Sequence, residues 1–323
     1  MEQDLNISLL GFNEESTAKL LGELTLHIMK SVELEYQLDI SRLKRVIITF
    51  DFQTALQDIA NQYNHLSIPT YTDSKQAKAV AKLFSKLEPD GKSSEYALVL
   101  SVNFFADIFD DEGKISLSCI SPVIHMIHHE LAHVHEYNRN ALDESRMIDD
   151  YDDIFLMTAK RVWAEYLANY MSSPTAPDKA IVDMLFTLET VLNEVPLEIE
   201  RFILDHKRGL LSLVDMHSSI VERIKLISAM YGYAQGYIQS LNIDLESQFR
   251  DLHDVLSSSC LCIPLQALGE SLPLIKREFD KDGLCEFEVF EPAIKAIRAM
   301  YASFGLRIER TNEPGMGLFI HVL

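Results

Sequence analysis

The residues best suited to chemistry form one short motif, His129-Glu130-Leu131-Ala132-His133. Positions i and i+4 of a helix share a face, so the imidazoles of His129 and His133 can converge on one metal ion. Glu130 lies beside that face, where its carboxylate can take a proton from a metal-bound water. Zinc lowers the pKa of such a water to about 7, and the carboxylate can later pass the proton to a leaving amine. The motif therefore predicts a zinc site with Glu130 as general base.

A catalytic zinc site takes three protein ligands and keeps one open position. The candidate third ligand is Glu165, which lies on the next predicted helix. HExxH on one helix and E-x-x-A-[ND] on the next resembles the gluzincin metallopeptidases, and is closest to the ImmA/IrrE-like group of bacterial intracellular peptidases. The resemblance covers about residues 96–174. It is carried by His129, Glu130, His133, Glu165, Ala168 and Asn169.

The resemblance implies a zincin-like fold, a single Zn²⁺ and hydrolysis of peptide bonds. It also implies that Asn169 hydrogen-bonds a ligand and sets its orientation, and that Ala168 lets the two helices pack closely. His125 lies on the ligand face one turn before His129, where it would contact a ligand or the substrate. The alternative for His125 is a helix histidine satisfied by its own neighbours.

Several other residues compete for roles at such a site. Asp149, Asp150, Asp152 and Asp153 would suit an aspartate zincin, but they belong to a predicted acidic loop at 143–153, and such runs are usually solvated. His128 and His135 are expected at the periphery, with a second weak metal site as the alternative. A peptidase also needs an electrophile for the developing oxyanion, and the sequence does not select one. The candidates are Tyr166, Tyr170, His206, His217, Tyr231, Tyr233 and Tyr237.

Hydrophobic periodicity predicts the elements that position the motif. Helices are expected at 14–38, 52–64, 73–87, 122–137 and 154–171, and strands at 46–50, 96–105 and 114–120, the last two as a hairpin. Residues 178–258 read as helical with a break at Pro196, followed by a helix at 291–304 and a strand at 316–322. This pattern predicts an α+β fold, with a zincin-like core at 1–177 and a mainly helical region at 178–323 that completes the cleft or stands apart.

Composition narrows the classes of partner. The chain has 323 residues and a formal net charge of −20, which argues against nucleic-acid backbones and anionic membrane surfaces. No segment approaches the roughly 18 to 20 apolar residues of a membrane span, and the first residues are acidic, unlike a secretory signal. The four cysteines form no CxxC pair. We therefore expect a cytoplasmic protein with reduced thiols, which acts on a peptide or protein substrate.

The sequence leaves three alternatives to a zinc metallopeptidase. The first is a polar helix face that binds no metal. The second is a di-iron site built on Glu130-x-x-His133, which needs a second E-x-x-H motif that we do not find. The third is a catalytically silent zincin-fold protein, with a structural or sensory metal site and a helical region that binds a protein partner. An open coordination position favours the enzyme.

Overall fold

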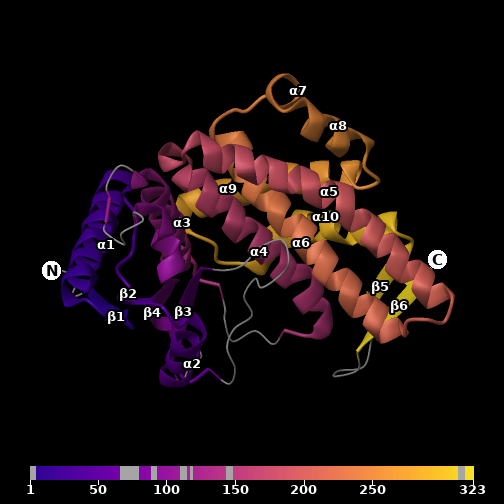
Figure 1. The fold of residues 1–323 in the computed structure, drawn as a ribbon. Helices are drawn as coiled ribbons and strands as arrows, with labels where there is room; N and C mark the ends of the chain where they lie inside the picture. Colours follow the sequence, from indigo (N-terminus) through magenta and orange to yellow (C-terminus); the bar gives the residue numbers. More distant parts are fainter. Residues whose placement is uncertain are drawn as a thin grey trace. The chain divides into compact units, whose positions relative to one another are not determined.

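The computed structural model describes residues 5–65, 80–88, 93–109, 115–116, 119–142, 148–311 and 317–323 (Figure 1). It confirms the predicted α+β class, because the protein is 69% helical with a small mixed sheet. The chain divides into two compact units, residues 1–139 with 174–177 and residues 140–173 with 178–323. Residues 150–172 thus group with the helical second unit, whereas the boundary predicted from the sequence at residue 177 assigned them to the first domain.

The first unit is built on a four-stranded sheet. Its strands are β1 (Asn6–Leu10), β2 (Leu43–Thr49), β3 (Ala81–Leu87) and β4 (Ser93–Ser101). Their order is β1-β2-β4-β3, with β1, β2 and β4 parallel and β3 antiparallel at one edge. The central strands carry the continuous buried runs 46–49 and 96–101, as strands covered on both faces do.

Helices cover both faces of this sheet. Figure 1 shows α1 (Glu15–Tyr36) and α2 (Phe52–Gln62) on opposite sides of the strands. Leu56 of α2 packs in one buried cluster with Ile47 and Val99, which share a face because they are paired across the central strands β2 and β4. On α1, Gly22 allows close approach to β1, since a Cβ there would lie 3.0 Å from a methyl of Leu9. The helix η1 (Val102–Ile108) leads from β4 toward α3 (Ser121–Arg139).

Two predicted elements of this unit are wrong. The segment 81–87, predicted as the end of a helix, is strand β3, because seven residues pair with β4 and this long-range pairing outweighs a helix-like spacing of apolar residues. Residues 66–79 and the turn at 110–113 lie outside the described residues. The predicted strand 96–105 ends at Ser101. Of its predicted partner strand 114–120, the described residues form one isolated bridge, between Phe109 and Ile115, and residues 114 and 117–118 lie outside the described part of the chain.

The second unit is a helical assembly with a short hairpin. Its helices are α4 (Asp150–Ser172), η3 (Ser173–Thr175, of which only Ser173 belongs to this unit), α5 (Asp178–Lys207), α6 (Leu213–Ser240), α7 (Leu245–Gln248), α8 (Arg250–Ser258), α9 (Cys262–Asp282), η4 (Phe287–Phe290) and α10 (Glu291–Ser303). Strands β5 (Leu306–Arg310) and β6 (Leu318–Val322) pair antiparallel. One continuous core joins the helices, and Trp163 lies fully buried in it against Tyr166 and Phe279.

The predicted break at Pro196 is wrong. Helix α5 runs through Pro196, whose side chain is buried. Proline removes one backbone hydrogen bond, but burial of an amphipathic face stabilises the helix on both sides of it. None of the described helices is long and apolar enough to cross a membrane alone; α8 and α9 pass that test only as a pair, and they meet at a bend of 113°.

Candidate metal centre

Helix α3 presents the HExxH motif on a helix whose opposite side is buried. Val123, Ile127, Leu131 and Val134 recur at helical spacing and are fully or almost fully buried. His129 and His133 therefore fall on the remaining side of α3, and both are half-buried. This confirms the helix that the sequence predicted around the motif, with bounds that differ by one or two residues.

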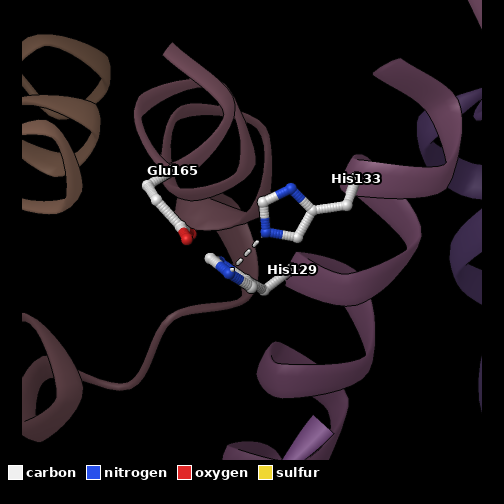
Figure 2. A group of neighbouring side chains, drawn as sticks. All are labelled: His129, His133 and Glu165. Carbon is white, nitrogen blue, oxygen red and sulfur yellow. Dashed lines mark hydrogen bonds between the residues drawn. The ribbon is translucent and has the colours of Figure 1, made fainter. Parts of the chain in front are cut away.

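The two imidazoles are arranged as ligands of one ion would be. His129 Nε2 and His133 Nε2 lie 3.2 Å apart, and the rings meet edge to face at 87° (Figure 2). Two nitrogens at 2.0–2.1 Å from a tetrahedral zinc ion would be separated by about 3.3 Å. The same distance also suits a hydrogen bond between a protonated and an unprotonated Nε2, which metal binding would replace. The separation of the two nitrogens therefore matches that of two ligands on one zinc ion.

Glu165 supplies a carboxylate from α4. The residue is half-buried, and the ligand atoms of His129, His133 and Glu165 all lie within 4.8 Å of one another (Figure 2). Two imidazoles and one carboxylate form a donor set found in catalytic zinc sites. Among the residues that the structure describes, no other group of three histidine, cysteine or acidic side chains lies close enough together to hold a metal ion.

Glu130 directly follows the first histidine of the pair on α3. It is half-buried, and it makes no hydrogen bond or ion pair with the described part of the chain. A carboxylate that is not tied to a cation or a donor can accept a proton from water. Its position next to His129 therefore agrees with the role of general base, which remains a prediction.

Two further histidines of the motif anchor α3. His128 is fully buried, stacks on Tyr36 of α1 at 4.1 Å, and hydrogen-bonds Thr175 Oγ1 through Nδ1 at 3.1 Å. Burial, with the nearby His125 and His129, lowers the pKa of His128 to about 3, so its imidazole is neutral. These contacts make His128 a structural residue.

His135 is the second anchor of α3. Its Nδ1 accepts a hydrogen bond from the backbone N–H of Asp39 at 2.7 Å. The side chain of Asn138 donates to the backbone carbonyl of Asp39 at 2.9 Å. The sequence placed His128 and His135 at the periphery of the metal site, and both are buried in contacts with other parts of the first unit. His125 is also buried, and its predicted contact with a ligand or substrate stays a prediction.

Two glycines of α6 position α4, and the sequence reasoning missed both. A Cβ on Gly236 would lie 2.6 Å from the carbonyl oxygen of Tyr166, and one on Gly232 would lie 2.7 Å from that of Val162. These contacts flank Glu165 on the α4 backbone. Asn169 adds a hydrogen bond from its Nδ2 to the Tyr233 carbonyl at 3.0 Å, while its predicted contact with a ligand stays a prediction.

The signal for these glycines was their G-x-x-x-G spacing at 232–236, inside a run that we read for its tyrosines. Tyr231 and Tyr237 belong to the buried interior of the second unit, and burial raises the pKa of each. Tyr166 is buried as well and donates from its hydroxyl to Gln239 Oε1 at 2.7 Å. These three phenols therefore serve packing, and the oxyanion-stabilising group remains open.

Three of the four rival aspartates have other partners. Helix α4 begins at Asp150, so the predicted acidic loop is wrong for its last residues, which form the first turn of a helix. Asp149 caps this helix by accepting the Asp152 N–H at 2.8 Å. Asp149 and Asp152 also pair with Arg310 at 3.0 and 2.7 Å, and Asp153 lies 3.3 Å from Lys225 Nζ. Residues 143–147 of the predicted loop lie outside the described residues.

The function proposed below rests on these residues and their geometry. Comparisons of the chain with protein-family models, with curated proteins and with solved structures found no match.

Proposed function

We propose that this protein is a zinc-dependent peptidase of the gluzincin type. His129, His133 and Glu165 are the metal ligands, and Glu130 is the general base. The observation that carries the proposal is the 3.2 Å separation of the two Nε2 atoms, which matches the spacing of neighbouring ligands on zinc. The carboxylate of Glu165 within 4.8 Å of both supports it as the third ligand.

The residues divide the chemistry between them. A bound zinc ion would supply a Lewis acid and lower the pKa of water. His129 and His133 would hold the ion through their imidazole nitrogens, and one Glu165 oxygen would offset part of the ionic charge. Glu130 takes the proton from the attacking water and delivers it to the nitrogen of the leaving amine, so that one carboxylate acts first as base and then as acid.

Metal analysis of purified variants tests the binding half of this proposal. We expect one zinc ion per chain in the wild type, and loss of that ion in His129→Ala and Glu165→Ala. His27→Ala is the matched control, because His27 is an exposed histidine on α1 and its loss should leave the zinc content unchanged. A wild-type protein that takes up no stoichiometric zinc would overturn the proposal.

Glu130→Gln tests the catalytic half. This variant keeps the shape of the side chain and the three ligands, so it should retain zinc. Cleavage of a fluorescence-quenched peptide library should fall by about 10²–10⁴-fold, the usual contribution of a general base. If the variant binds zinc and cleaves as fast as the wild type, Glu130 is not the general base. If neither protein cleaves, the site is structural or sensory and the silent zincin-fold alternative holds.

A further inference from the structure

A cavity of about 420 Å³ lies wholly within the second unit, at the start of α4 and beside η4, α10 and β5. Its floor is apolar and is formed by Phe155, Leu156 and Ile308, which are all buried. Tyr151 and Phe287 add two aromatic rings to its wall. A hollow of this size, with buried apolar side chains at its base and charged groups around it, falls within the size range of small-molecule sites.

Three of the six charged residues that line this cavity already have partners. The Arg310 guanidinium lies 3.0 Å from an Asp149 oxygen and 2.7 Å from an Asp152 oxygen, and Asp152 is buried. Glu309 lies 3.1 Å from Arg307 Nε. The ion pairs of Arg310 hold the N-terminus of α4 to strand β5, and one guanidinium there offsets part of the charge of two carboxylates.

Three charged groups at the rim remain available to a ligand. Arg298 of α10 is exposed and lies 6.0 Å from the ring of Tyr151, and it makes no ion pair within the described part of the chain. Glu288 and Glu291 are also exposed, line the same cavity, and pair with no described residue. The rim therefore offers one guanidinium and two carboxylates above an apolar floor.

We propose that this cavity binds a free amino acid or a dipeptide with apolar side chains. Arg298 receives the ligand's carboxylate, because a guanidinium pairs with a carboxylate through two parallel hydrogen bonds. Glu288 and Glu291 receive the α-ammonium group, and the side chain lies on the floor formed by Phe155, Leu156 and Ile308. A phosphate ligand is disfavoured because the free carboxylates outnumber the free cation, and a simple amine would leave Arg298 unused.

The binding experiment uses the full-length Glu130→Gln protein in EDTA, so that neither cleavage nor metal binding contributes. Calorimetry with L-phenylalanine and with L-leucyl-L-phenylalanine should show saturable binding, and the tighter of the two identifies the ligand's length. Phenethylamine lacks the carboxylate and N-acetyl-phenylalanine lacks the ammonium group. Each should bind about 10-fold more weakly or worse, since each loses a hydrogen-bonded charge pair.

Variants assign the two ends of the ligand. Arg298→Gln should weaken phenylalanine about 10-fold and leave phenethylamine unchanged, whereas Glu288→Gln combined with Glu291→Gln should weaken phenylalanine and spare N-acetyl-phenylalanine. Lys295→Gln is the matched control, because Lys295 is an exposed cation of α10 that does not line the cavity. Circular dichroism verifies that each variant is folded.

Three results would overturn the proposal: no saturable binding of either zwitterion, equal affinities in all variants, or phenethylamine binding as tightly as phenylalanine. None of these results depends on zinc or on peptide cleavage. The cavity and the metal centre can therefore fail separately.

Discussion

The helices that carry the proposed ligands are held by different forces in the two units. In the first unit, α3 is anchored by polar contacts of buried histidines: His128 with Thr175, and His135 with the backbone N–H of Asp39. In the second unit, α4 is anchored by close backbone packing against Gly232 and Gly236 of α6. A histidine pair and a carboxylate, all proposed to bind one ion, are thus positioned by hydrogen bonding on one side and by steric fit on the other.

These two kinds of anchor respond differently to change. A hydrogen bond sets the rotation of a helix about its axis and can be lost alone, at a cost of about 1 kcal/mol, or up to about 3 kcal/mol if a buried group is left unpaired. A backbone contact at van der Waals distance sets the separation of two helices, so one added methyl group must move a whole helix. We therefore expect α4 to be the more sensitive of the two.

Gly236→Ala should give the largest effect. The new Cβ would lie 2.6 Å from the Tyr166 carbonyl oxygen and 2.8 Å from the Tyr170 nitrogen, and neither backbone atom can turn aside as a side chain can. We expect a loss of about 3 kcal/mol in the free energy of unfolding, at the upper end of the overpacking range. Urea denaturation followed by the fluorescence of Trp163, the single tryptophan of the chain, reports on this unit directly.

The matched control is Gly22→Ala in the first unit. Its Cβ would lie 3.0 Å from a Leu9 methyl, which is the end of a flexible side chain, and alanine gains up to about 1 kcal/mol of helix propensity over glycine. The net change should be close to zero by circular dichroism. Equal losses in Gly22→Ala and Gly236→Ala would refute the steric account of α4. If Glu165 binds zinc, Gly236→Ala should also lower zinc affinity by about 10-fold or more.

His135→Phe should give a smaller effect. Phenylalanine fills a similar volume but has no acceptor, so the backbone N–H of Asp39 loses its partner in a partly buried place. We expect a loss of about 1–2 kcal/mol in the free energy of unfolding, measured by urea denaturation with circular dichroism. His27→Phe removes an exposed histidine of the same unit and should change stability by less than about 0.5 kcal/mol. A loss in His27→Phe as large as that in His135→Phe would contradict the anchoring role.

The motif of the site could be predicted from the sequence, but the contacts that hold its helices in place could not. The HExxH motif and the helix that carries it follow from residues a few positions apart, and the predicted helix 122–137 matches α3 (Ser121–Arg139) closely. The contact of His135 with Asp39, which lies 96 residues away, could not be read from the sequence. The spacing of Gly232 and Gly236 was visible, but the helix against which they pack could not be read from their own neighbours.

The errors in secondary structure have the same origin. Residues 81–87 space their apolar side chains as a helix does, yet they form β3 because β4 offers seven pairing positions. Pro196 stays within α5 because its face is buried in the core of the second unit. In both cases a contact distant in sequence outweighed a local preference, which a single sequence does not reveal.

The smallest predicted effect concerns Tyr63, at the C-terminal end of α2. Burial, together with the nearby Glu95, raises the pKa of Tyr63 to about 12, whereas in the unfolded chain it is about 10. A raised folded pKa means that the stabilisation is complete below pH 10 and is lost as the pH rises from 10 through 12, because only the unfolded chain then releases the proton. Urea denaturation at pH 9, 10 and 11 should show stability falling less steeply in Tyr63→Phe than in the wild type.

The second unit supplies most of the alkaline loss, since burial also raises the pKa of Tyr166, Tyr231, Tyr237 and Tyr301. Trp163 fluorescence should therefore show a steeper loss of stability with rising pH than Tyr63 alone causes, in the wild type and in Tyr63→Phe alike. If circular dichroism gives the same pH dependence of stability for both proteins, Tyr63 does not contribute to the alkaline loss.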